Sequence, residues 1–451
     1  MLRASFAAER AGIPSATIVS SQFMRLGKHV SKGLGMEALP MAEYQGVPMT
    51  DGIEQLKRKV AATMVDQIVS GLTSQPLQGQ GDIEPAPDEI VFGGDLVGVQ
   101  DYFYDRLWTD GLPIIPPTRA TVAHMLRFTT RAASDVVGVL PPDNRQATVW
   151  SIAVNGVMAG CRPEYMPLLI ATVEAIAAPE FRLRSAGSTP GWEPLVIVNG
   201  PIAKQLDFNA GTGAMRSGRR ANSTVGRFLK LYMRNVAGLR TPPGEGDKGI
   251  IGSNFNVALA EDEDSIAQLG WNTFSTDRGF AIKESVVTVQ GVLFTSPPIY
   301  SSGDTAELHL QMLLEVFGQA CTYRAHVGLI NKAYEPLLIL GPSVARVLAK
   351  DGLSKNDLRH FLFKHATMPA HTMERYALAG GHTRFSLREL ARKGDIPMAY
   401  YESDDPDRLV PVFVAPEMIG VVVAGDSGRN QSKGYVINHV HGRPVSKRIV
   451  S

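Results

Sequence analysis

The sequence predicts a mixed α/β protein, in which a small N-terminal α/β segment completes a sheet and a larger body has two related halves. Three apolar runs support this prediction, because runs of four to eight apolar residues bounded by turn residues are typical of buried strands. These runs are residues 194–199, 336–340 and 419–424. The first two both end in Gly-Pro before a helical stretch, and this repeat predicts the two halves.

The N-terminal segment, residues 1–75, has only one convincing strand, Ala16–Val19, between helices expected at 6–10, 24–34 and 52–72. A buried strand without neighbours would leave backbone donors and acceptors unpaired, at a cost of roughly 1–3 kcal/mol each. We therefore expect further strands, either from the rest of this chain or from a second polypeptide.

The remaining chain is expected to divide into a linker, a domain and a C-terminal half. The linker, residues 76–100, begins with a stretch rich in Gln, Gly and Pro. An α/β domain over 101–300 follows, with a helix at Ala120–Ala132 and two helices between Val149 and Ala177 that are hinged at 160–163. Residues 301–451 form the C-terminal α/β half.

The composition excludes several classes of protein. The 45 basic and 44 acidic residues nearly balance, so no long-range field would gather nucleic acid. No apolar run reaches the roughly 18–20 residues of a membrane helix, and the N-terminus lacks the apolar stretch of a signal peptide. Two cysteines in 451 residues make no disulfide scaffold. These observations predict a soluble protein of the cytoplasm.

The segment Gly160-Cys161-Arg162-Pro163-Glu164-Tyr165 is the first candidate site. Proline is favoured at the first position of a helix, so Cys161 is expected at a helix N-terminus beside Arg162. Both features lower a thiol pKa and increase the nucleophilic thiolate, with Glu164 as an acid or base. The alternative is a buried structural cysteine. The second cysteine, Cys321, is expected in the core.

A second candidate site is the glycine-containing stretch from Asn209 to Gly213, together with the polar residues that follow it. Glycines let backbone N–H groups approach an anion, and arginines bind carboxylate or phosphate with two parallel hydrogen bonds. Asn222 or Ser223 is expected to cap a helix that begins near Thr224. The predicted substrate-binding residues are Asn209, Arg219, Arg220, Asn222 and Ser223; an ordinary surface loop is the alternative.

Near the C-terminus, the donor-rich loop 426–433 follows an apolar strand, and Ser427 and Arg429 are expected to contact a ligand there. His439 and His441 form an H-x-H pair, which would place both imidazoles on one face of a strand and could suit a divalent metal. A third ligand would have to come from elsewhere, such as His326, His365, His371 or His382. Two surface histidines are the alternative. The four acids 261–264 are expected to form a solvated face.

Two stretches resemble known families. Residues 9–15, Phe23 and residues 33–36 resemble the second half of the UGSC domain, which is distantly similar to the selenocysteine-containing B component of glycine reductase. In that family a U/C-G-S-C motif precedes this region, so the resemblance implies a second polypeptide that carries a CGSC/UGSC-type motif. Residues 155–167, with the signature GCRPEY, resemble a poorly characterised bacterial family over roughly 100–300.

Together these features predict a subunit of a cysteine-dependent lyase or reductase. It would cleave or form a carbon–sulfur or other carbon–heteroatom bond in a small anionic substrate, using Cys161, Glu164 and Arg162. Two alternatives stay open. One is a metal-dependent hydrolase or lyase built on His439 and His441, and the other is a non-catalytic structural subunit of a heteromeric enzyme. Beyond a possible divalent metal, the sequence predicts no cofactor.

Overall fold

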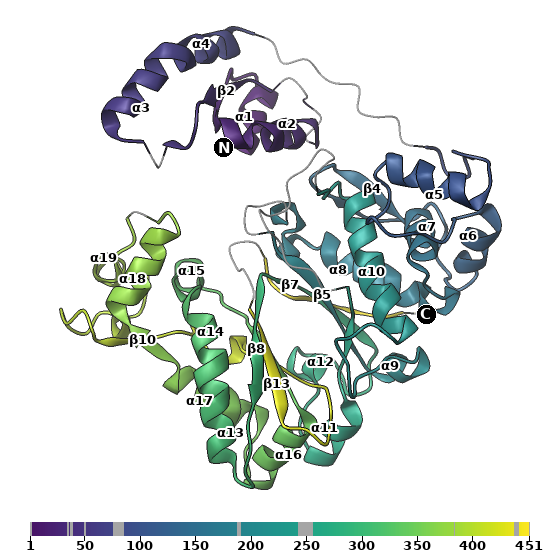
Figure 1. The fold of residues 1–451 in the computed structure, drawn as a ribbon, viewed down its shortest axis with the longest axis vertical. Coiled ribbons are helices and arrows are strands. Elements are labelled where there is room, and N and C mark those ends of the chain that lie inside the picture. The colour runs from purple at the N-terminus through teal and green to yellow at the C-terminus, as the bar shows by residue number, and fades with distance from the viewer. Residues whose placement is uncertain are drawn as a thin grey trace.

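The computed structural model describes residues 2–33, 36, 39–48, 51–74, 85–186, 191–241, 256–382, 384–436 and 442–450. It contains a small N-terminal module, residues 2–74, and a larger body that begins at residue 85 (Figure 1). The predicted mixed α/β class is confirmed. No helix in the described part of the chain has the length and apolar character needed to cross a membrane.

The N-terminal module has a second strand that the sequence did not reveal. Strand β1, Thr17–Ser20, pairs in parallel with β2, Met41–Tyr44, so β1 has a neighbour within its own chain. The half-buried Glu43 of β2 interrupts the apolar run that would have marked this segment as a strand. The helices that pack around the pair are α1 Leu2–Arg10, α2 Met24–Gly33, α3 Ile53–Lys59 and α4 Val65–Thr73, with short helical turns at Ser21–Phe23 and Val60–Met64.

The first part of the body is mainly helical. Its elements are α5 Leu96–Asp105, α6 Arg119–Leu126, the hairpin β3 Val136–Leu140 and β4 Arg145–Thr148, α7 Val149–Ala159, the turn η4 Pro163–Tyr165 and α8 Met166–Ala177, followed by turns at Pro179–Phe181 and Leu183–Ser185. The predicted break between α7 and α8 is confirmed. Helix α6 ends six residues before the expected Ala132, because Thr129 to Asp135 forms hydrogen-bonded turns instead.

Two four-stranded sheets form the centre of the body. The first has the order β14-β7-β5-β6, and the second has the order β12-β9-β13-β8. The strands of the first are β5 Glu193–Asn199, β6 Leu259–Ala260, β7 Val286–Val292 and β14 Val445–Arg448. The strands of the second are β8 Phe294–Tyr300, β9 Leu337–Leu340, β12 Gly420–Val423 and β13 Gln431–Val436.

Helices accompany each sheet. The helices between β5 and β7 in the chain are α9 Pro201–Gln205, α10 Arg220–Asn235, α11 Glu263–Leu269 and α12 Phe274–Asp277, of which α11 and α12 contact β12 of the second sheet. Those of the second half are α13 Ala306–Leu313, η7 Leu314–Gly318, α14 Gln319–Thr322, α15 Ala325–Asn331, α16 Pro342–Lys350, α17 Lys355–His365, α18 Ala370–Ala379 and α19 Leu387–Arg392. A small antiparallel pair, β10 Thr367–Pro369 with β11 Leu409–Pro411, and turns at Met398–Tyr400 and Pro416–Met418 complete this half.

The two sheets have the same topology, as the Gly-Pro repeat predicted. Each sheet contains one parallel pair, β5 with β6 or β9 with β12. A third strand, β7 or β13, pairs antiparallel with β5 or β9, and a fourth, β14 or β8, pairs antiparallel with the third. Gly200 and Gly341 occupy matching positions, each at the start of a helix with proline at its first position. The fourth strands are exchanged: β8 follows β7 in the chain but pairs with β13, whereas β14 follows β13 but pairs with β7. The sheets therefore cross the boundary that was expected at residue 300.

The sheets pack face to face, with helices on both outer sides (Figure 1). Successive residues of a strand point to opposite faces of its sheet. In each sheet, one set of side chains therefore lies between the two sheets, and the other set faces the helices. Leu195 and Ile197 of β5 meet Leu337 and Ile339 of β9 in the layer between the sheets. Val196 and Val198 face the core with α7, α8 and α10, whereas Leu338 and Leu340 face the core with α13, α16 and α17.

A buried carboxylate ties the two sheets together. Glu261, directly after β6, has a fully buried side chain that accepts hydrogen bonds from Asn199 Nδ2 (2.7 Å), Phe274 N (2.6 Å) and Val423 N (3.2 Å). Lys355 Nζ lies 3.2 Å from its Oε1 atom. The solvated acidic face predicted for 261–264 is wrong at this position, because the end of β6 lies inside the core.

The three other acids of this run also have partners, and Glu263 shares Asn199 Nδ2 (3.1 Å) with Glu261. Asp262 caps α11 by accepting from Ser265 N (3.1 Å). Glu263 Oε1 accepts from Gly200 N (2.7 Å), and exposed Asp264 pairs with Lys204 (2.5 Å).

Candidate functional site

The GCRPEY segment forms the turn between α7 and α8. Gly160 ends α7 with a left-handed backbone (φ 86°), which favours glycine, and Pro163 begins the short turn η4. Cys161 is buried, and its thiol donates a hydrogen bond to the carbonyl oxygen of Thr224 in α10 (3.4 Å). Arg162 and Glu164 are on the surface beside it.

The lowered thiol pKa expected for Cys161 is wrong. Burial raises the pKa of Cys161 to about 12, and this outweighs the hydrogen bond with Thr224 and the positive charges of Arg220 and Arg227, which lower it. The sequence placed the cysteine correctly at the break between two helices, but α8 begins only at Met166, and the tight contact of α7, α8 and α10 removes water from the sulfur. Catalysis by Cys161 stays a prediction.

The predicted arginine pair does not form one site. Arg219 extends to exposed Asp207 (2.9 Å), and Arg220 Nε donates to the carbonyl oxygen of Gly160 (3.0 Å). Helix α10 begins at Arg220, four residues earlier than expected, so Asn222 and Ser223 lie inside its first turn and do not cap it. Ser223 Oγ instead accepts from Gly218 N (3.4 Å).

Asn209 and Asn222 shape the glycine loop. Asn209 Oδ1 accepts from Gly211 N (3.0 Å), and its Nδ2 donates to the carbonyl oxygen of Thr212 (2.9 Å). Buried Asn222 holds the Asn209 backbone from both sides, through Asn209 N (2.8 Å) and Asn209 O (3.0 Å). Both asparagines therefore fix the shape of the loop.

This glycine loop meets the loop that follows β12, which is three residues shorter than the predicted 426–433 because β13 begins at Gln431. Gly425 N donates to the carbonyl oxygen of Ala210 (2.8 Å), which joins the two loops directly. Between them and the edge of the inter-sheet layer lies a cavity of about 790 Å³, which we name the loop cleft. Its polar lining includes Arg216, Tyr300, Asp426, Arg429, Gln431 and Lys433.

The charge of the loop cleft is mainly positive. Three cationic side chains line it, against one carboxylate, Asp426, which lies 3.7 Å from exposed Arg429. Lys433 Nζ lies over the ring of Tyr435, 6.0 Å from its centroid. Of the predicted ligand contacts, only Arg429 is among these lining residues. Ser427 lies beside it, and its carbonyl oxygen accepts a hydrogen bond from Arg346 (2.9 Å). Arg216 and Lys433 were missed, although both lie within a few residues of predicted positions.

The predicted metal pair, His439 and His441, lies outside the described residues. Elsewhere in the described chain, no three His, Cys, Asp or Glu side chains are grouped so that they could hold a metal ion. His326, one of the suggested third ligands, is buried against the rings of His382 and Phe385. Burial there lowers the pKa of His326 to about 4.

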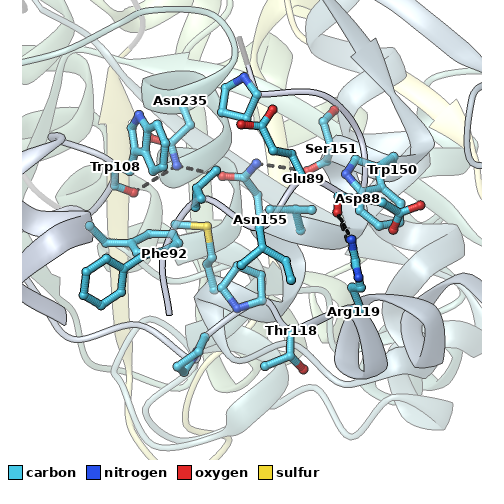
Figure 2. A pocket seen from close by; sticks show the side chains of 18 of the residues that line it. Asp88, Glu89, Phe92, Trp108, Thr118, Arg119, Trp150, Ser151, Asn155 and Asn235 are labelled. Carbon is cyan, nitrogen blue, oxygen red and sulfur yellow. Dashed lines mark hydrogen bonds between the residues drawn. The ribbon is translucent and has the colours of Figure 1, made fainter. Parts of the chain in front are cut away.

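A second cavity, of about 650 Å³, lies in the helical part of the body, where no sequence pattern indicated a site. We name it the aromatic cavity, after the rings of Phe92, Phe103, Trp108 and Trp150 that line it. Figure 2 shows Asn155 between Trp108 and Phe92 on one side and Trp150 and Arg119 on the other. The walls come from residues 85–94, α5, α6, α7 and the end of α10.

The comparisons with known proteins concern only the N-terminal module. No curated protein and no solved structure matches the chain. Residues 1–74, which comprise the β1–β2 pair and its helices, match the model of the UGSC family, and this segment is therefore UGSC-like.

Proposed function

We propose that this chain is the substrate-binding subunit of an enzyme that acts on a small anionic molecule, and that the loop cleft holds this molecule. The observation that supports the proposal is the set of three cations, Arg216, Arg429 and Lys433, around one cavity between two joined loops. Such a cleft attracts anions, and arginine suits carboxylate and phosphate groups in particular.

The reactive thiol or selenol of this enzyme, in our proposal, belongs to a second polypeptide. Burial keeps the Cys161 thiol protonated near neutral pH, and Cys321 is also fully buried with a raised pKa. The UGSC-like N-terminal module supports a partner that carries a CGSC/UGSC-type motif. The reaction would then be the cleavage or formation of a carbon–sulfur or other carbon–heteroatom bond at the shared site.

Lys433→Met and Arg216→Met should each weaken anion binding to the loop cleft by about tenfold. Each replacement removes one cation and keeps most of the apolar stem, and a charge-assisted hydrogen bond contributes roughly 1.5–3 kcal/mol. Isothermal titration calorimetry with inorganic phosphate and with acetate would measure the change and would also rank the two anion classes.

Lys364→Met is the matched control, because Lys364 is exposed at the end of α17 and outside the cleft. It should bind both anions as the unmodified protein does. Equal anion affinities for the Lys433, Arg216 and Lys364 variants would refute the proposal that the loop cleft binds the anion. The absence of any binding of phosphate or acetate would do the same.

The N-terminal module has a surface suited to the second polypeptide. On α4, Val65, Val69 and Leu72 are 49%, 54% and 42% exposed, and their spacing of four and three residues places them on one helix face. Ile18 of β1 is also 42% exposed. Two parallel strands are fewer than a stable sheet ordinarily has, so added strands would stabilise the module.

Val69→Asp should therefore abolish a complex with a co-expressed CGSC-type protein, because it places a charge at the centre of the apolar stripe. Size-exclusion chromatography with light scattering would report the complex. Glu54→Asp, on the exposed side of α3, is a control that keeps the charge. A stable, fully active chain that forms no complex with such a protein would refute the two-polypeptide part of the proposal and leave the anion-binding part intact.

A further inference from the structure

The aromatic cavity is independent of the loop cleft and has the features of a second ligand site. Its volume of about 650 Å³ lies within the range of roughly 300–1,000 Å³ that small-molecule sites have. Such sites combine apolar walls with a few placed polar groups. Here the rings of Phe92, Trp108 and Trp150 and the side chains of Val154 and Met158 form the apolar part.

One wall is a packed group of rings. Phe92 stacks on Tyr102 with centroids 4.8 Å apart, and Trp108 meets Tyr102 (6.1 Å) and Phe103 (5.5 Å) edge to face. Phe92 belongs to the segment 85–94, which covers the cavity without helix or strand. Arg119 of α6 fastens this segment by donating to the carbonyl oxygen of Asp88 (2.5 Å and 3.2 Å).

A directed series of hydrogen bonds crosses the polar side of the cavity (Figure 2). Asn235 Nδ2 donates to the carbonyl oxygen of Trp108 (3.0 Å) and to Asn155 Oδ1 (2.8 Å). Asn155 Nδ2 in turn donates to the carbonyl oxygen of Ser151 (2.9 Å). Because both partners of Asn235 Nδ2 are acceptors, the orientation of this amide is fixed.

This series of hydrogen bonds leaves one acceptor for a ligand. Asn235 Oδ1 is buried and has no hydrogen-bond partner among the described residues. Buried polar atoms are ordinarily paired, so an unpaired acceptor in the lining of a cavity indicates a donor that arrives with a ligand. Arg145, a cation of this lining, donates to the carbonyl oxygen of Asn235 (2.9 Å) and lies 3.7 Å from Asp143, which is equally close to Arg240.

We propose that the aromatic cavity binds an uncharged, planar aromatic molecule with an N–H or O–H donor, and that Asn235 Oδ1 accepts its hydrogen bond. The rings of the walls select an aromatic ligand, since aromatic pairs attract beyond their buried area. The lining contains two cationic residues, Arg119 and Arg145, and two acidic residues, Asp88 and Glu89, and this balance selects a neutral ligand. The cationic lining of the loop cleft selects the opposite class, so the two sites differ in what they bind.

Indole and 1-methylindole test this proposal, because they have the same ring system and only indole has an N–H donor. Calorimetry should show that the protein binds indole at least tenfold more tightly than 1-methylindole, since a buried acceptor left unpaired disfavours the methylated ring. Lys433→Met, in the loop cleft, should leave the affinity for indole unchanged.

Val154→Trp would fill the cavity from α7 and should abolish indole binding, whereas Val97→Trp should not. Val97 is 67% exposed on α5 and is absent from the lining. The comparison of the two probes on the unmodified protein decides the proposal even if the Val154 variant does not fold. Equal affinities for indole and 1-methylindole would overturn the proposal. Failure to bind either probe, or undiminished binding by a folded Val154→Trp variant, would overturn it as well.

Discussion

Iodoacetamide should alkylate Cys161 about a thousandfold more slowly in the folded protein than an exposed cysteine at pH 7.5. Burial raises the pKa of this thiol from its ordinary value near 9 to about 12. The thiolate, the form that reacts, is therefore scarcer by about three orders of magnitude. The alkylation rate should rise about tenfold for each pH unit, because the thiolate fraction of a group far below its pKa grows in that proportion.

Ser217→Cys supplies the exposed reference thiol, since Ser217 lies on the surface between the glycine loop and α10. Peptide mapping by mass spectrometry, at pH 7.5 and 8.5, would follow the native and the introduced thiol in one sample. Unfolding in urea should bring Cys161 to the rate of the reference. Labelling of Cys161 in the folded protein as fast as the introduced thiol would contradict the raised pKa, and faster labelling would restore the interpretation of Cys161 as a low-pKa nucleophile.

Lys355→Met should lower the free energy of unfolding by about 3–5 kcal/mol. Lys355 is 4% exposed and lies 3.2 Å from Glu261, whose carboxylate is fully buried. Lys355 Nζ also lies 3.6 Å from Asp277, which pairs with Arg359 (2.6 Å). Removal of one partner leaves the other as an uncompensated buried charge, which destabilises the folded protein more than replacement of both partners does. Urea unfolding followed by circular dichroism would measure the loss.

The matched control is Lys204→Met, because Lys204 forms an ion pair of even shorter distance with Asp264 (2.5 Å) while both side chains are about two-thirds exposed. Exposed pairs contribute about 0–1 kcal/mol, so this variant should unfold almost as the unmodified protein does. The double variant Lys355→Met/Glu261→Gln should have a higher free energy of unfolding than Lys355→Met alone, since it also removes the buried charge of Glu261. Equal effects of Lys355→Met and Lys204→Met would contradict the role of Glu261 as a buried link.

The apolar strands could be predicted from sequence, because a strand that is buried on both faces has apolar residues at nearly all of its successive positions. Residues 336–340 and 419–424 contain the central strands β9 and β12, and residues 194–199 cover all of β5 except its first residue. Strand β2 could not be recognised, since Glu43 breaks its pattern, and no local pattern indicates which strands pair. The exchange of β8 and β14 depends on contacts between residues more than 130 positions apart, such as Ser432 with Ile299.

The candidate sites could be predicted only where local residue types mark them. The loop after β12 was recognised because it follows an apolar strand, whereas the glycine loop, which follows α9, was recognised by its glycines and by the arginines after it. The buried state of Cys161 depends on Thr224, 63 residues away, and that of Glu261 depends on Lys355, 94 residues away. The aromatic cavity joins Phe92, Trp150 and Asn235 from three distant segments, and none of them is unusual in its local sequence.

The exchanged fourth strands have a consequence for synthesis of the chain on the ribosome. Strands β5, β6 and β7 are all made before residue 293, but β14, which pairs with β7 from Val445↔Val289 to Arg448↔Val286, is made only after all four strands of the second sheet. The edge of β7 therefore stays open while more than 150 residues are added, and the first sheet closes only after the second is complete. Emergence of β14 from the ribosome is thus the step that allows the first sheet to close and the two halves to join.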